Sequence, residues 1–277
     1  MKVLISVDME GISGLVHPSE MNPDRHDYAH GRALMTAEAN AVVAGVLDAE
    51  PTATVRVADA HGTFRNLLPA ELDRRAQLVR GKPRPYGMLG GIDAETEAVL
   101  FVGYHARAGV GPAVVAHTMN GNILDVRVAG RSLGEIGLNA AMAGALGVPV
   151  VLLSGDDTAC AEVRELIPTA VTVPVKQALA QAAAVTLHPE EARERLRRAA
   201  AEAITRRASV PPLVLDGPFD VEVDFTEPHM VDLATLVPGV TRTGPDGGRT
   251  VTFIVDAFTD AYRLLLLLVQ LSTVRPA

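Results

Sequence analysis

The chain has 277 residues, of which 48% are hydrophobic, and its formal net charge is −8. This composition excludes a disordered chain, and its length is enough for one large or two modest domains. An acidic chain without a basic block argues against a nucleic-acid partner. Cys160 is the only cysteine, so no disulfide can form within the chain.

Neither a signal peptide nor a membrane span is expected. Asp8 and Glu10 interrupt the apolar run at the start of the chain, unlike the apolar region of a signal peptide. The apolar run at 264–271 is far shorter than the roughly 20 residues needed to cross a bilayer. We therefore expect a cytoplasmic protein that has no membrane partner.

Short apolar runs alternate with helix-like stretches along the first two thirds of the chain. Runs rich in β-branched residues predict strands, and apolar residues at helical spacing predict helices. The predicted strands are 2–8, 54–60, 98–106 and 148–156, and the predicted helices are 31–50, 134–147 and 157–167. This alternation is typical of an α/β fold with three layers, in which helices cover both faces of a mostly parallel sheet.

The pattern changes near residue 185. A long charged helix is predicted over 188–209, and it is followed by strand-like stretches at 212–225 and 241–256 that surround a Gly-rich turn. A last helix is predicted from about 256 to 272. We predict an α/β domain at 1–185 and a smaller C-terminal α+β portion at 186–277.

Acidic residues and histidines follow the predicted strands. Asp8 and Glu10 come after the first strand, Asp59 and His61 after the second, and His105 after the third. Ligand sites in open α/β sheets lie at the carboxyl ends of the strands, so these side chains should share one rim. Residues two apart in an extended segment point to the same face, so Asp8 and Glu10 would repel each other unless a cation lies between them.

Downstream of these strands, His117 lies in VVAHTMNG and Glu135 lies in the first turn of a predicted helix. With them, the rim offers three carboxylates and two imidazoles as ligands, from Asp8, Glu10, Glu135, His61 and His105. This set is too large for one tetrahedral ion with an open position, and it suits two ions that share a bridging carboxylate. Nitrogen and oxygen ligands without thiolate favour zinc, with manganese or cobalt as other occupants, and such a pair favours hydrolysis.

Each residue taken alone has a simpler interpretation. His61 or His105 can be an ordinary hydrogen-bonding residue at a strand end, and Glu135 suits the start of any helix. Asp59 either caps the next turn or orients His61. Only the coincidence of five ligands at one edge argues for a metal site.

Other polar residues also have two interpretations each. The loop at 14–30 is either a lid or a solvated connection, and Asp156 and Asp157 either reach the rim or cap a helix. Lys176 either holds a carboxylate of the substrate or is solvated.

Several short motifs resemble the DppA-type zinc-dependent D-aminopeptidase family. They occur in order over roughly the first 180 residues, and no motif is matched in the last third. The motifs are VDMEGISG (7–14), GR-x-x-MT-x-EAN (31–40), DAH (59–61), GYHAR (103–107), AHTM (116–119), GE-x-GLNA (134–140), SGDD (154–157) and PVKQAL (174–179).

The resemblance implies a metallo-aminopeptidase that removes an N-terminal D-amino acid, such as D-alanine, from short peptides. It implies two zinc ions per subunit, with Asp8 as the bridging ligand, His117 as the catalytic residue, and a homodecamer shaped as a ring. It assigns the metal to the same five residues that the strand ends predict: Asp8, Glu10, His61, His105 and Glu135.

Two other functions stay open at this point. The first is another dinuclear-metal hydrolase, an amidase or a phosphoesterase, and the second is a noncatalytic module that binds peptides. A phosphoesterase should present arginine or lysine at the rim for the phosphate charge, and Arg107 is the obvious candidate.

Overall fold

The larger of two sheets forms the centre of the structure, a computed structural model that describes residues 1–244 and 248–275. Its seven strands have the order β3-β2-β1-β4-β7-β8-β9, and every neighbouring pair is parallel except β8 and β9. They are β1 (Lys2–Val7), β2 (Thr54–Asp59), β3 (Ala76–Val79), β4 (Thr96–Tyr104), β7 (Val150–Asp156), β8 (Val171–Ala180) and β9 (Ala183–Thr186). The predicted α/β class with a mostly parallel sheet is confirmed.

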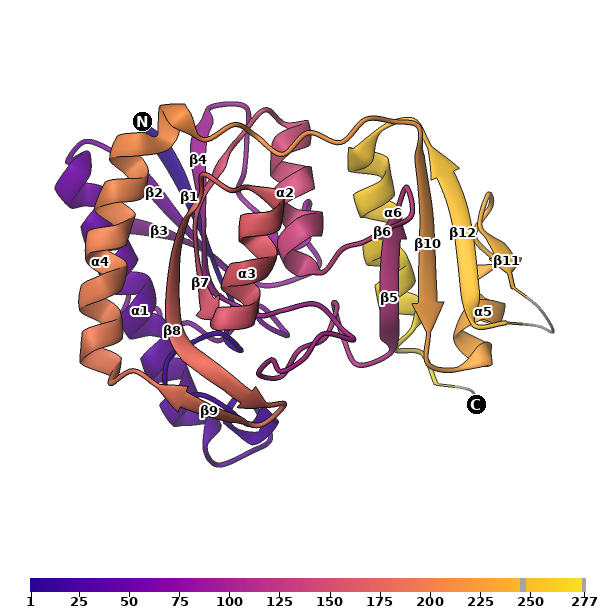
Figure 1. Ribbon diagram of the computed structural model, residues 1–277, viewed down its shortest axis with the longest axis horizontal. Coiled ribbons are helices and arrows are strands. Elements are labelled where there is room, and N and C mark those ends of the chain that lie inside the picture. Colours follow the sequence, from indigo (N-terminus) through magenta and orange to yellow (C-terminus); the bar gives the residue numbers. More distant parts are fainter. Residues whose placement is uncertain (245–247, 276–277) are drawn as a thin grey trace.

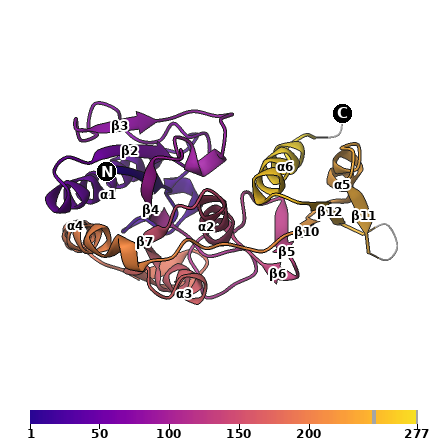
Figure 2. The ribbon, with the colours of Figure 1, turned by 90° about the horizontal axis from the view of Figure 1, so that it is seen from above.

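Helices cover both faces of this sheet and complete the three predicted layers (Figure 1, Figure 2). α1 (Tyr28–Ala49) and α4 (Pro189–Arg206) pack on one face, and α2 (Glu135–Ala145) and α3 (Asp157–Leu166) pack on the other. α1 and α4 approach closely at Gly45, where an added Cβ would lie 2.2 Å from the carbonyl oxygen of Arg197. Three short 3₁₀ helices are η1 (Pro18–Glu20), η2 (Gly87–Leu89) and η3 (Arg207–Ser209).

A second, antiparallel sheet stands beside these layers (Figure 1). Its strands, in spatial order, are β11 (Thr241–Thr243), β12 (Thr250–Val255), β10 (Phe219–Phe225), β5 (Ile123–Val128) and β6 (Arg131–Ser132). α5 (Pro228–Ala234) and α6 (Phe258–Leu271) pack on it, and α6 also contacts α2 of the first layers. The second sheet therefore lies against the parallel sheet domain through α6.

Segments on both sides of residue 185 contribute to each part of the molecule. α4 packs on the parallel sheet, whereas β5 and β6 belong to the second sheet. The division of the chain near 185 stays a prediction. The Gly-rich turn predicted between the last strands includes residues 245–247, which lie outside the described residues.

The strand order creates one favourable place for a ligand. After β1 the chain adds β2 and β3 on one side, and it then returns to add β4 and β7 on the other side. Ligands in open α/β sheets bind outside the carboxyl ends of the strands where the order reverses in this way. Among the described residues, no helix is long and apolar enough to cross a membrane.

Candidate metal centre

The predicted site residues meet where the strand order reverses. Asp8 directly follows β1, His61 lies two residues after β2, and His105 directly follows β4. Because β2, β1 and β4 are neighbours in the sheet, their ends bring these side chains together. Glu10 lies on the loop after Asp8, and it is 5% exposed. The shared rim predicted from the strand ends is therefore present.

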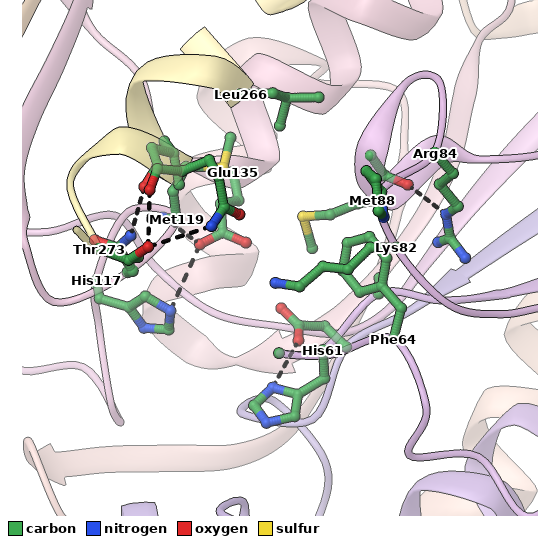
Figure 3. Close-up of a pocket in the computed structure, with 18 of the residues that line it drawn as sticks. His61, Phe64, Lys82, Arg84, Met88, His117, Met119, Glu135, Leu266 and Thr273 are labelled. Atoms are coloured by element: carbon green, nitrogen blue, oxygen red, sulfur yellow. Dashed lines mark hydrogen bonds and ion pairs between the residues drawn. The ribbon is translucent and has the colours of Figure 1, made fainter. Parts of the chain in front are cut away.

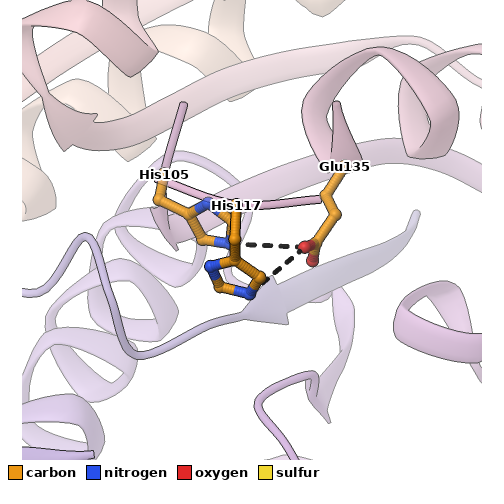
Figure 4. Close-up of side chains that lie close together, drawn as sticks. All are labelled: His105, His117 and Glu135. Atoms are coloured by element: carbon orange, nitrogen blue, oxygen red, sulfur yellow. Dashed lines mark ion pairs between the residues drawn. The ribbon is translucent and has the colours of Figure 1, made fainter. Parts of the chain in front are cut away.

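Glu135 and His117 complete the cluster, and Figure 4 shows both of them beside His105. Glu135 is the first residue of α2, and its Oε1 accepts a hydrogen bond from the backbone N–H of Met119 over 2.6 Å. The same oxygen lies 3.4 Å from His105 Nε2 and 3.6 Å from His117 Nε2. The two imidazole rings stack with their centroids 4.1 Å apart. Glu135 thus faces two histidines at once.

Asp8 lies between His61 and His105. Its Oδ1 is 3.4 Å from His61 Nδ1, and its Oδ2 is 3.5 Å from His105 Nε2. Glu10 Oε2 approaches the same nitrogen of His61, at 2.9 Å. An Asp8 carboxylate that faces both histidines has the position expected of a bridging ligand.

Each imidazole is oriented by a backbone carbonyl. His105 Nδ1 donates to the carbonyl oxygen of Ala106 over 3.0 Å, and His117 Nδ1 donates to that of Val115 over 2.9 Å. His61 instead uses Nε2, which lies 3.0 Å from the carbonyl oxygen of Met21. A carbonyl that holds one ring N–H leaves the other nitrogen free to accept, and this is the usual arrangement behind metal-ligating histidines.

The buried charges favour a cation at the centre. Burial raises the pKa of Asp8 well above its usual range, and the neighbouring Glu10 raises it further. Burial alone would lower the pKa of His105, but Glu135 and Asp8 outweigh it and hold that pKa well above its ordinary value. Three buried carboxylates therefore make positive charge favourable here.

The donor set fits a metal ion in its spacing. Ligand atoms of Asp8, Glu10 and His105 all lie within 4.8 Å of one another, as do those of His105, His117 and Glu135. Tetrahedral zinc holds nitrogen and oxygen ligands at about 2.0–2.2 Å, which separates the ligand atoms by about 3.4 Å. Among the described residues, the buried Asp8 Oδ2 and His105 Nε2 atoms have no hydrogen-bond partner. These two atoms without hydrogen-bond partners face each other, and an ion bound between them would contact both.

A cavity of about 570 Å³ opens onto this cluster (Figure 3). Asp8, Glu10, His61, His117 and Glu135 are among the residues that line it. The rest of the wall is largely apolar, and it includes Phe64, Met88, Met119 and, from α6, Leu266 and Val269. The second sheet domain therefore supplies part of the wall through α6, which no sequence motif indicated.

Asp59 combines both roles that the sequence left open. Its carboxylate accepts hydrogen bonds from the backbone N–H groups of Asn66 and Leu67, so it caps the turn. The Asn66 side chain also donates to Asp59 and to the carbonyl oxygen of His61. Asp59 thus fixes the backbone of His61 through Asn66, without touching the imidazole.

Lys176 has neither of its predicted roles, because it is buried and its ammonium is surrounded by backbone carbonyls. Its ammonium donates to the carbonyl oxygens of Glu10, Ile12 and Leu15. Nearby, the buried Glu38 accepts a hydrogen bond from the backbone N–H of Ser13. Sequence reasoning missed this support of the loop that carries Glu10, because nothing in the pattern around Lys176 marks it as buried.

The structure also shows the contacts of the other residues that had two interpretations. Asp156 caps α3 by accepting from the N–H of Ala159, and it accepts from Val114 as well. The loop at 14–30 includes η1 and is partly exposed, and it reaches the site through the carbonyl of Met21. Arg107 donates to the carbonyl of Ala108 and is not among the described residues that line the cavity.

Comparisons with known proteins agree on one kind of enzyme. The sequence model of peptidase family M55, described as D-aminopeptidase, matches residues 1–267. A D-aminopeptidase of Bacillus subtilis (strain 168) is 36% identical over 273 residues, which are 98% of this chain and 98% of that protein. The structure of the Zn-dependent D-aminopeptidase DppA from Bacillus subtilis, described as a self-compartmentalizing protease, matches with a TM-score of 0.95 and 34% identity over 100% of both chains. The similarity thus extends through the last third, where no motif was matched.

Proposed function

Because the chain belongs to the M55 family of D-aminopeptidases, we propose that it is a zinc-dependent enzyme that removes an N-terminal D-residue, such as D-alanine, from short peptides. The observation that carries this proposal is the cluster in which buried carboxylates face imidazoles that backbone carbonyls orient. The full-length similarity to a Zn-dependent D-aminopeptidase supports the choice of metal and of reaction.

Five residues would hold two zinc ions per subunit. Asp8 would bridge them, because its two oxygens face His61 and His105. The proposed ligands are Asp8, Glu10, His61, His105 and Glu135. When bound, such a pair of ions polarises the scissile carbonyl and lowers the pKa of a water molecule.

His117 is the proposed catalytic residue. Its Nδ1–H is held by the carbonyl of Val115, so its Nε2 is the nitrogen that can accept and return a proton. Burial and the neighbouring His105 lower the pKa of His117, which keeps the imidazole neutral and able to accept a proton. The ring lies at the edge of the cavity, where it can reach a bound peptide (Figure 3).

The His117→Ala variant tests this role against the alternative of a sixth ligand. Its Nε2 belongs to a group of possible ligand atoms with His105 and Glu135. We expect the variant to lose turnover while its zinc content, measured by mass spectrometry of the metal, equals that of the wild type. A variant that loses zinc would make His117 a ligand.

Hydrolysis of paired D-alanyl and L-alanyl amides tests the function as a whole. We expect cleavage of the D-isomer, loss of cleavage after chelation, and recovery when zinc returns to two ions per chain. Absence of cleavage in a protein that holds two zinc ions would refute the proposal and favour a noncatalytic peptide-binding module.

We further propose that the protein is cytoplasmic and forms a homodecameric ring. The relative described as a self-compartmentalizing protease supports an assembly of this kind. Native mass spectrometry of the purified protein measures the number of subunits, and a monomer would refute the assembly.

A further inference from the structure

The wall of the cavity contains two cationic side chains, Lys82 and Arg84, among the residues described. Arg84 is already occupied by the protein, because its guanidinium donates to the carbonyl oxygens of Val79, Asp59 and Gly87. It also stacks over the Phe64 ring, with Cζ 4.3 Å from the ring centroid. Arg84 therefore holds the turn in place, with three of its five N–H groups donating to backbone carbonyls.

Lys82 is different, because its ammonium has no ion-pair or hydrogen-bond partner among the residues that the structure describes. Figure 3 shows this ammonium reaching into the cavity from the wall that carries Phe64 and Arg84. Its nitrogen lies 5.4 Å from the centroid of the Phe64 ring. Burial against this wall lowers the pKa of Lys82, which means that the charge is only partly solvated.

The turn that carries Lys82 is held by hydrogen bonds on both sides. The N–H of the preceding Gly81 donates to the carbonyl of Phe64 over 2.7 Å, and Arg84 donates to the carbonyl of Gly87, which follows. The backbone from which Lys82 extends toward the cavity is therefore fixed, so its charge can contact a group of a bound molecule.

The charges of the cavity define how a peptide can lie in it. The carboxylates of Asp8, Glu10 and Glu135 in its lining mark the site of the proposed reaction, where the N-terminal residue must be placed. Lys82 repels the amine of a peptide and attracts a carboxylate. Since the cavity has a volume of about 570 Å³, within the range typical of small-molecule sites, a short peptide fits it whole.

We propose that Lys82 binds the C-terminal carboxylate of the peptide substrate, and that the enzyme therefore prefers short peptides with a free C-terminus. This inference rests on the proposed aminopeptidase function. It makes Lys82 a specificity-determining residue that touches the substrate through its carboxylate and takes no part in breaking the bond.

The test compares D-alanyl-D-alanine with its C-terminal amide, which differ only in the charge at the far end. The variants are Lys82→Met, which removes the charge, and Arg80→Gln as a matched control. Arg80 is exposed, lies two residues away and does not line the described cavity. kcat/KM is measured for both substrates with each protein, and thermal melting verifies that each variant is folded.

We expect Lys82→Met to lower kcat/KM for the free dipeptide about tenfold, with less than about twofold change for the amide. Arg80→Gln should keep the wild-type ratio between the two substrates. An unchanged ratio in Lys82→Met, with hydrolysis intact, would overturn the role of Lys82 and leave the proposed function standing. Failure of the wild type to cut either substrate would instead overturn the proposed function, and the inference with it.

Discussion

Replacing Lys176 with methionine tests how the loop that carries Glu10 is held. Lys176 is 3% exposed, and its ammonium donates to the carbonyl oxygens of Glu10, Ile12 and Leu15 over 2.6, 3.0 and 2.5 Å. Methionine keeps the length and the apolar stem of the side chain, but it removes all three donors. The three buried carbonyls would then lack these partners.

The size of the effect follows from these contacts. A hydrogen bond to a charged group contributes about 1.5–3 kcal/mol, so three contribute about 5–9 kcal/mol. Burial of the ammonium offsets part of this, because it lowers the pKa of Lys176 to about 8, which corresponds to about 3 kcal/mol. We therefore expect Lys176→Met to reduce the free energy of unfolding by about 2–6 kcal/mol, a large part of the stability of a typical domain.

Two measurements check this expectation. Urea unfolding in the presence of a chelator gives the free energy of unfolding without a contribution from metal. Competition with a chelating dye gives the zinc affinity, which should fall by about 10–100-fold because Glu10 loses its support.

Lys2→Met is the matched control. Lys2 forms ion pairs with Asp93 and Glu95 near the surface, and such pairs contribute little to stability. A Lys176→Met variant that binds zinc as well as the wild type, and whose free energy of unfolding lies within about 1 kcal/mol of the wild-type value, would refute the reasoning.

Three further predictions concern the fold. Burial raises the pKa of Glu38 to about 7 from 4.5, so the folded chain binds this proton more tightly than the unfolded chain. As the pH rises from 4.5 through about 7, the free energy of unfolding of the wild type should fall by about 3 kcal/mol relative to that of Glu38→Gln. Urea unfolding with a chelator measures both proteins across this pH range, and parallel pH profiles would contradict this expectation. Burial raises the pKa of Cys160 to about 12, so a thiol reagent at neutral pH should label it only after unfolding, and fast labelling of the native protein would be inconsistent with this packing. Gly45→Ala should lower the free energy of unfolding by about 1–3 kcal/mol, because the new Cβ meets the carbonyl of Arg197; an unchanged melting temperature would show that α1 and α4 separate without cost.

The sequence by itself determined four strands of the parallel sheet, β1, β2, β4 and β7, and the residues that gather at its edge, whereas β3, β8 and β9 were not predicted. Strands buried on both faces are apolar runs, and in β4 the residues from Ala98 to Tyr104 are all buried. The polar residues come directly after such runs, as Asp8 and His105 do. Because parallel strands end at one edge, their side chains could be placed together before the strand order was known.

The sequence also determined the type of chemistry, since ligand preference is a property of the side chains themselves. It could not determine which nitrogen of each histidine faces the site. That choice depends on carbonyls such as Met21 and Val115, which reach the imidazoles through the folding of separate loops.

Only the tertiary structure decided how distant segments combine. β5 pairs with β10, and α6 from near the end of the chain forms part of the cavity wall. Lys176 is buried because the carbonyls after β1 surround it, and Lys82 faces the cavity because Arg84 holds its turn. These outcomes depend on contacts between residues far apart in the sequence, and local periodicity and residue type contain no information about such contacts.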